Sequence, residues 1–529
     1  MRIPPLLRYA TILLSLSAPL LAQAPSGSAP PTFAELSELA RLPEAEIDLA
    51  EAALIIAKGV NPAVRVDRYE SKLDGLANEL EARLASRTDP KSRLRMMAAV
   101  IYLDWGFGRS EVVAPDVFVG FNEVLDQQQW NCFGLTVLYV TLGERLGISL
   151  RMVAGRGHVF VEHDSSPPLY IETTDKGEVH GSKDYLATYL PFPCVRPEDY
   201  RALDKKQTVA VVLTQTALAI QHRGNLDLAR SYYSMALEFD PRSAEALSGL
   251  GFLDLNAGNL EAANANFEKA VKADPTYREA LGGLGSARYA TGDRDAAAKA
   301  YRNALDLCPD DAKTVYNLAQ ILYEMDRFNE SITLYRKYTE LVPNDPDGYA
   351  RLAFPLEDSG DLEGALAAYQ KALQLNPQYV DAYINMGIVY EKMENFDAAR
   401  QSFEWAIRLQ PDSALAYAGL ARVFNAQGNR QQAFAAISRA AQIDRANPAV
   451  WLDFGAILRD AGDIDRAIES YQRAALLLSD DSEPYEALAE LHLGKGDIEA
   501  ASAAAKRAAD LGGKLSPELE ALAHSRVQE

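Results

Sequence analysis

Cysteine and histidine are scarce in this sequence, which contains three cysteines and six histidines among 529 residues. None of them occurs at the spacing of a zinc site. The chain also lacks a phosphate-binding glycine loop and the paired carboxylates of a glycosidase. Beyond the N-terminus, no apolar stretch is long enough to span a bilayer. We therefore expect no metal, no cofactor and no integral membrane span once the N-terminal segment is removed.

Positive charge is also in short supply. The 53 Lys and Arg residues are outnumbered by 74 Asp and Glu residues, which gives a formal net charge of -21. Surfaces that bind nucleic acid or anionic membranes are dominated by Lys and Arg, so this balance disfavours both partners. A chain of this length is too long for a single core and is expected to form two or more domains.

The first 24 residues have the pattern of a signal peptide. Arg2 and Arg8 precede an apolar run from Ala10 to Leu21, followed by the small-x-small sequence Ala22-Gln23-Ala24. We expect cleavage after Ala24 and a periplasmic or secreted protein. The alternative is an uncleaved anchor. No cysteine lies near the cleavage site, which argues against a lipoprotein.

A period of 34 residues runs through the last three fifths of the chain. It is marked by prolines, by small residues and by aromatic residues that each recur at this step; the prolines are Pro241, Pro275, Pro309, Pro343, Pro377 and Pro411. A period of this length predicts a stacked array of helix pairs. Glycines such as Gly224 and Gly258 separate the two helices of a unit, and each proline ends the second helix.

These units resemble the tetratricopeptide repeat (TPR), as Leu250-Gly251, Leu284-Gly285 and Met386-Gly387 indicate. We predict about nine units over residues 206–515, starting near residues 210, 244, 278, 312, 346, 380, 414, 448 and 482, and a capping helix or tail at 516–529. The resemblance implies protein or peptide partners in the groove. The groove positions that hold Lys and Asn in carboxylate-clamping relatives are Ser248, Gly282, Tyr316, Ala350 and Ile384, so that clamp is not expected.

Residues 25–205 are predicted to form a separate α+β domain. Apolar spacing indicates helices over residues 33–107. Asn131 is a plausible N-cap for an apolar helix that opens at Cys132 and stops at Gly147. Strands are expected at Leu150–Ala154, His158–His163 and Leu169–Thr174, with a turn at residues 164–168.

The start of that helix suits a thiol nucleophile. The helix dipole and the backbone N–H groups there favour a thiolate, and the same N–H groups can bond a developing oxyanion. If the turn has five residues, His163 lies opposite Leu169, and His158 shares a face with Glu172 as its diagonal neighbour. A four-residue turn would place Glu172 on the opposite face. The predicted site therefore depends on one register.

Four segments resemble the transglutaminase-like superfamily, which shares the papain-like fold: Cys132-Phe133-Gly134-Leu135-Thr136, Gly143-Glu144-Arg145-Leu146-Gly147-Ile148, Gly157-His158-Val159-Phe160-Val161 and Ile171-Glu172-Thr173-Thr174. The nearest resemblance is to a bacterial branch in which this domain, with a helical lead-in, precedes TPR units. It implies Cys132 as nucleophile, His158 as base and Glu172 as acid. Asp175 is the substitute acid, and Trp130 or Gln129 is a candidate to assist at the oxyanion.

Two functions follow from this reading. The first is an exported TPR scaffold whose Cys-His-Glu site performs amide or isopeptide acyl transfer or hydrolysis. The second is a catalytically inactive adaptor, in which Cys132 is a core residue and His158 a structural histidine. Cys308 is interpreted as a buried filler, and a disulfide between Cys194 and Cys132 would block the thiol. The sequence indicates neither the substrate nor the oligomeric state.

Overall fold

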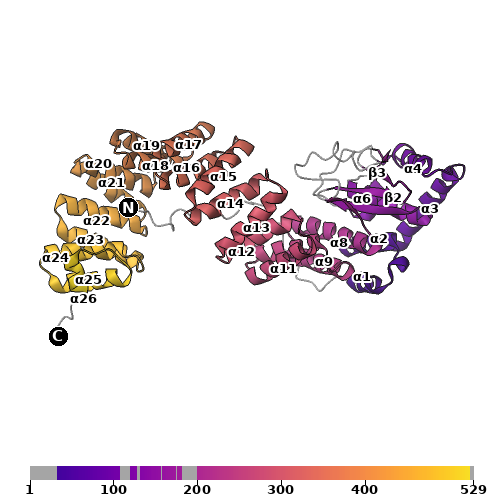
Figure 1. The fold of residues 1–529 in the computed structure, drawn as a ribbon, viewed down its shortest axis with the longest axis horizontal. Helices are drawn as coiled ribbons and strands as arrows, with labels where there is room; N and C mark the ends of the chain where they lie inside the picture. The colour runs from indigo at the N-terminus through magenta and orange to yellow at the C-terminus, as the bar shows by residue number, and fades with distance from the viewer. Residues whose placement is uncertain are drawn as a thin grey trace. The chain divides into compact units, whose positions relative to one another are not determined.

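A computed structural model describes residues 32–107, 120–127, 132–155, 158–173, 176–181 and 199–524. The chain divides into two compact units, residues 1–310 and 311–529. The first holds the α+β region and the first helix pairs of the array, and the second holds the remaining pairs (Figure 1).

Helices occupy the described part of residues 32–127, as predicted for residues 33–107. They are α1 (Thr32–Arg41), η2 (Glu44–Glu46), α2 (Leu49–Val60), α3 (Val66–Leu84), α4 (Pro90–Ala99), the π-helical turn η3 (Val100–Asp104) and α5 (Phe121–Gln127). The Asp48 carboxylate caps α2 by accepting from the N–H groups of Ala50 and Glu51. The residues of α2 from Leu49 to Ala57 are almost all buried, because α1, α3, α5, α6 and α8 pack around it.

The α+β region is completed by α6 (Cys132–Arg145) and a five-stranded antiparallel sheet. Its strands are β1 (Leu150–Gly155), β2 (His158–His163), β3 (Leu169–Glu172), β4 (Glu178–His180) and β5 (Arg201–Ala202), in the order β4-β3-β2-β1-β5. The first three strands confirm the sequence prediction. Strands β4 and β5 were not predicted, because strands of three and two residues are too short to display an alternating pattern.

The register of β2 and β3 is the predicted one. His163 pairs with Leu169, Glu162 with Tyr170 and Val161 with Ile171, so residues 164–168 form the five-residue connection. Side-chain alternation then places Val159, Val161 and Ile171 in the core shared with α6. Phe160 and Tyr170 lie on the other face, in a cluster with Val153 and Tyr200.

The first helix pair of the array is continuous with this core. It consists of α8 (Lys205–His222) and α9 (Leu226–Phe239), which contact α2 and α1 respectively. Helix α8 begins at Lys205 rather than near residue 210, because Asp204 and Gln207 form a capping box there. One cluster of buried side chains extends from Phe33 to Leu253, so the first pair covers the lead-in helices.

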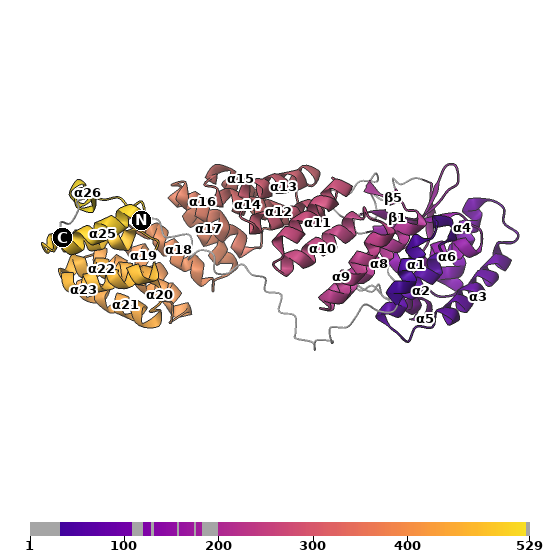
Figure 2. The same cartoon turned by 90° about the horizontal axis from the view of Figure 1, so that it is seen from below.

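The later helix pairs follow the predicted period. In the compact unit of residues 1–310, these helices are α10 (Ala244–Asn256), α11 (Leu260–Ala273), α12 (Arg278–Ala290) and α13 (Arg294–Leu307). In the second they are α14 (Ala312–Glu324), α15 (Phe328–Leu341), α16 (Pro346–Asp358), α17 (Leu362–Leu375), α18 (Val380–Lys392), α19 (Phe396–Leu409), α20 (Ala414–Ala426), α21 (Arg430–Ile443), α22 (Pro448–Ala461), α23 (Ile464–Leu477), α24 (Glu483–Gly494), α25 (Ile498–Asp510) and α26 (Pro517–His524). Within each unit, consecutive pairs lie side by side (Figure 2).

Packing inside the array follows from the repeated residues. The small residues Ala263, Ala365 and Ala399 are fully buried, and the aromatic rings of Phe267, Tyr369 and Phe403 fill the space between helices. The predicted turn glycines, Gly224 and Gly258 among them, adopt left-handed φ angles. In two of the helix pairs the turn residue is not glycine: Asp326 and Glu394 occupy it, with φ angles of 56° and 57°.

One cysteine prediction was wrong. Cys308 is buried as expected, but it is a disulfide-bonded cysteine rather than a filler. Cys132 is the free cysteine among the described residues, which contradicts its pairing with Cys194. Cys194 itself lies outside the described residues. The sequence could not settle this, because cysteine spacing along a chain does not reveal which sulfur atoms meet in space.

Candidate functional site

Cys132 is the first residue of α6, as the sequence predicted, and its side chain is partly exposed. The rest of the helix from Phe133 to Gly143 is buried. Cys132 is therefore the partly exposed residue at the start of an otherwise buried helix segment. Asn131, the predicted N-cap, and Gln129 and Trp130, the candidates for oxyanion assistance, lie outside the described residues.

His158 and Glu172 form a hydrogen-bonded pair at the end of the sheet. The distance between His158 Nε2 and Glu172 Oε2 is 2.8 Å, and their side chains are 10% and 0% exposed. A carboxylate without any solvent contact is costly unless a hydrogen-bond donor satisfies it. The imidazole supplies that donor, and the carboxylate in turn fixes which ring nitrogen carries the proton.

Cys132 lies close enough to His158 to influence the pKa of its imidazole. Burial lowers the pKa of His158, but the hydrogen bonds and negative charges of Cys132 and Glu172 outweigh burial and raise this pKa to about 9. An imidazole with such a pKa is protonated at neutral pH.

The structure thus brings together the three residues singled out in the sequence. Cys132 comes from the start of α6, His158 from the start of β2 and Glu172 from the end of β3 (Figure 1). Asp175, the substitute acid, lies outside the described residues. The centroid of the His158 ring also lies 6.1 Å from that of the Phe160 ring, two residues further along β2.

A group of hydroxyls that the sequence analysis missed supports the site. Thr136 Oγ1 donates to the Cys132 carbonyl at 2.7 Å, and Thr173 Oγ1 donates to the same oxygen at 3.2 Å. Tyr102 donates through its hydroxyl to the Thr173 carbonyl at 2.6 Å. Thr173 is adjacent to Glu172, so these bonds tie the end of β3 directly to the first turn of α6. Thr and Tyr are common in apolar segments, and no spacing in the sequence distinguishes this group.

Gly177 is hydrogen-bonded back to the end of β3. Its N–H donates to the Glu172 carbonyl at 3.0 Å, and its φ is +74°. A Cβ at this position would lie 2.6 Å from both Ala98 Cβ and Tyr139 Oη. Glycine is therefore required where the turn packs against α4 and α6. This close approach holds the buried end of β3 in place.

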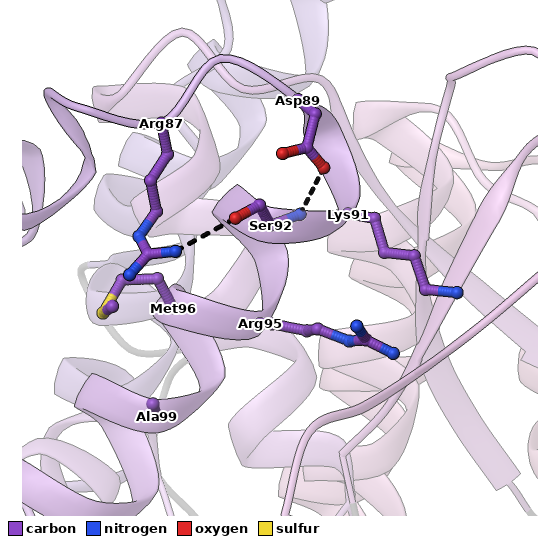
Figure 3. Close-up of a pocket in the computed structure, with 7 residues that line it drawn as sticks. All are labelled: Arg87, Asp89, Lys91, Ser92, Arg95, Met96 and Ala99. Atoms are coloured by element: carbon purple, nitrogen blue, oxygen red, sulfur yellow. Dashed lines mark hydrogen bonds between the residues drawn. The ribbon is translucent and has the colours of Figure 1, made fainter.

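The pocket drawn in Figure 3 lies away from these three residues. It has a volume of about 380 Å³ and is lined by Arg87, Asp89, Lys91, Ser92, Arg95, Met96 and Ala99. Its residues belong to α4 and to the turn that precedes it. It is therefore a separate feature of the same region.

Comparisons with known proteins agree with this architecture. Residues 67–213 match the family described as transglutaminase-like superfamily. Residues 250–312, 283–346, 384–448 and 452–516 match one tetratricopeptide repeat family, and residues 356–394 match another. The chain therefore combines a transglutaminase-like domain with a TPR array, as the sequence predicted, and the array indicates that protein partners bind.

Among curated proteins, a UPF0162 protein of Vibrio cholerae serotype O1 is 23% identical over 214 residues, which cover 39% of this chain and 79% of that protein. Among solved structures, YrrB, described as a TPR protein with an unusual peptide-binding site, is 24% identical, with a TM-score of 0.33 over 35% of this chain and 95% of its own. PilF of Pseudomonas aeruginosa is 21% identical, with a TM-score of 0.35 over 41% of this chain and 98% of its own.

Proposed function

We propose that this protein is an exported, thiol-dependent enzyme that transfers or hydrolyses acyl groups at amide or isopeptide bonds, with the TPR array binding the protein partner. The observation that carries the proposal is the placement of Cys132, His158 and Glu172 together. His158 Nε2 lies 2.8 Å from the fully buried Glu172 carboxylate, and Cys132, a partly exposed residue, lies close enough to raise the pKa of His158. A purely structural histidine needs neither a reactive neighbour nor a buried acid.

The chemistry follows from the protonation state of the pair. An imidazolium beside the sulfur stabilises the thiolate, which is the nucleophilic form. The thiolate attacks the carbonyl carbon of an amide and forms a carbon–sulfur bond. The imidazolium then gives its proton to the leaving nitrogen as the carbon–nitrogen bond breaks. This step releases an amine and leaves a thioester on Cys132.

The second half of the reaction regenerates the thiolate. Water or an amine loses a proton to the neutral imidazole and attacks the thioester carbon. The carbon–sulfur bond breaks, and the product is a carboxylic acid with water or a new amide with an amine. Glu172 stabilises the imidazolium in both halves by accepting from Nε2. Hydrolysis and crosslinking share the thioester, so the choice between them depends on the second substrate.

Export is part of the proposal. It is supported by the signal-like N-terminal sequence and by the disulfide at Cys308, because disulfides persist mainly in oxidising compartments. In the described part of the chain, no helix has the length and apolar character needed to cross a membrane. Cleavage after Ala24 is tested by N-terminal sequencing of the mature protein.

The test of catalysis uses a thiol-directed probe on the full mature chain. We expect iodoacetamide to modify Cys132 at least about tenfold faster than it modifies a free cysteine at pH 7, because the imidazolium favours the thiolate. Peptide mapping locates the label. Cys132→Ala is expected to abolish it, and His158→Gln to slow it to the rate of an ordinary thiol.

A second measurement separates the enzyme from an adaptor. Partner capture by the TPR array is expected to survive Cys132→Ala, while release of amine from the captured partner is lost. Wild-type labelling no faster than that of free cysteine would overturn the catalytic proposal. Circular dichroism of each variant establishes that the fold is retained.

A further inference from the structure

Glu172 and Thr173 are consecutive residues, and each contacts a different member of the site. The Glu172 carboxylate lies 2.8 Å from His158 Nε2, and the Thr173 hydroxyl donates to the Cys132 carbonyl at 3.2 Å. We propose that Thr173 is a positioning residue that sets the place of Cys132 relative to His158. This inference rests on the proposed function, because it assigns a role within the same site.

A single peptide unit joins these two contacts. The Cα atoms of Glu172 and Thr173 are separated by one planar peptide, a distance of about 3.8 Å that does not vary. Both residues are 0% exposed, so packing holds their side chains on every side. Cys132 can therefore move away from His158 only if the bond to Thr173 breaks or the buried end of β3 moves with it.

Thr173 is itself held from a third element. Tyr102, in the π-helical turn η3, donates through its hydroxyl to the Thr173 carbonyl at 2.6 Å. Turns of this kind are rare and occur frequently at functional sites. Thr173 thus binds η3 with its carbonyl and α6 with its hydroxyl. Its hydroxyl is a fixed anchor for the first residue of α6.

Thr136 also bonds the Cys132 carbonyl but cannot have the same effect. Its hydroxyl donates to that oxygen at 2.7 Å from the next turn of α6 itself. A bond between two turns of one helix moves with the helix. Of the two hydroxyl bonds, the one from Thr173 is the one that joins α6 to the end of β3.

The anchor has a consequence that can be measured at His158. Burial lowers the pKa of this imidazole, whereas Cys132 and Glu172 raise it, to about 9 in all. The contribution of Cys132 decreases with distance, because a negative charge stabilises an imidazolium less from farther away. Loss of the Thr173 hydroxyl should therefore lower the pKa of His158 and slow alkylation of Cys132.

The test follows the titration of His158 by NMR in the full mature chain with ¹³C-labelled histidine, assigned with His158→Gln. Thr173→Val removes the hydroxyl, and the Cys132 carbonyl keeps its bond from Thr136. We expect it to lower the measured pKa of His158 by at least about 0.5 and the iodoacetamide rate at pH 7 at least about threefold. Thr173→Ser, which keeps the hydroxyl, should restore both values.

Thr141→Val is the matched control. Thr141 is a fully buried residue of α6 whose hydroxyl donates to the Leu138 carbonyl at 3.0 Å, within the helix. Its loss should cost stability without changing the pKa of His158. An equal decrease in Thr141→Val and Thr173→Val would overturn the proposal, because it would show a general loosening of the helix.

A second background shows which partner the anchor acts through. In Cys132→Ala, addition of Thr173→Val should leave the pKa of His158 unchanged; the same decrease as in the parent chain would place the effect on Glu172 and overturn the proposal. So would a Thr173→Val protein that titrates like wild type. Circular dichroism checks the fold, and Thr173→Ala replaces Thr173→Val if the latter is unfolded.

Failure of the enzyme is a separate result. Wild-type protein that labels no faster than free cysteine and releases no amine would contradict the proposed function. The decrease in the pKa of His158 caused by Thr173→Val would still support the positioning role, because that measurement requires no catalysis. Fast labelling of wild type that is unaffected by Thr173→Val would retain the enzyme and reject the anchor.

Discussion

The transglutaminase-like region and the TPR array use their residues in opposite ways. In the array, the same small and aromatic residues return every 34 positions and make the same contact each time. In the site region, the important contacts occur once, between Cys132, His158 and Glu172 from three different elements. A repeated contact is specified many times over by local pattern, whereas a unique site depends on one sheet register and one helix position.

Paired charges also differ between the array and the site region. In the array, the Arg422 guanidinium binds Glu391 at 2.9 Å and Asp453 at 2.8 Å, so that one cation joins α18, α20 and α22. All of its charge is neutralised by structural partners. In the site, the Glu172 carboxylate is fully buried and paired with His158, which also lies beside the partly exposed residue Cys132. His158 therefore has a free cysteine beside it as well as a carboxylate, whereas both partners named for Arg422 are carboxylates.

Among the predicted changes, Phe403→Ala is expected to have the largest effect on stability, and it compares the array with the site. The ring of Phe403 is fully buried and packs against Gly387 of α18 and Gly419 of α20. Its removal should lower the local free energy of unfolding by about 3–5 kcal/mol. Hydrogen exchange of α18–α20 measures the loss, and Phe403→Leu is the milder control. The iodoacetamide rate at Cys132 should not change; a slower rate would contradict the separation of array and site.

An intermediate effect is expected from pH. The pKa of His158 is raised from 6.5 to about 9, so the folded state binds this proton more tightly than the unfolded state. The stabilisation is complete below about pH 6.5 and is lost as pH rises through 9, an effect of roughly 2–3 kcal/mol. Hydrogen exchange of β2 and β3, compared between wild type and His158→Gln, measures it. A difference that is constant from pH 6 to 10 would contradict the pairing.

The smallest effect is expected from Glu394→Gly. Glu394 has a φ of 57° at the turn where other units have glycine, and a side chain is strained in that conformation. Glycine should stabilise the turn between α18 and α19 by up to about 1 kcal/mol, because the relief of strain exceeds the added entropy of the unfolded chain. The thermal unfolding midpoint measures the gain. Gly428→Glu, the reverse change in the following unit, should destabilise by a similar amount.

Much of the fold could be predicted because the signals are local and periodic. The starts of α10, α12, α14, α16, α18, α20 and α22 are the residues expected from the 34-residue step. In the site region, the five-residue connection between β2 and β3 followed from proline and polar residues at 164–168. That connection, together with side-chain alternation along the strands, placed His158 next to Glu172.

Features that depend on distant contacts could not be predicted. The bonds from Thr136 and Thr173 to the Cys132 carbonyl join residues whose types are unremarkable in sequence. Gly177 is needed because Ala98 and Tyr139 crowd it, and nothing near it in the chain reveals that crowding. The disulfide at Cys308 was missed for the same reason.

By itself, the sequence determined the helix pairs and their period, and it singled out Cys132, His158 and Glu172 as candidates, because helical period, turn residues and strand alternation act over a few neighbours. Only the tertiary structure decided that the imidazole of His158 pairs with the buried carboxylate of Glu172 beside Cys132. The reason is that hydrogen bonds and charge neutralisation act over a few ångströms, and the chain brings those atoms together only when it packs.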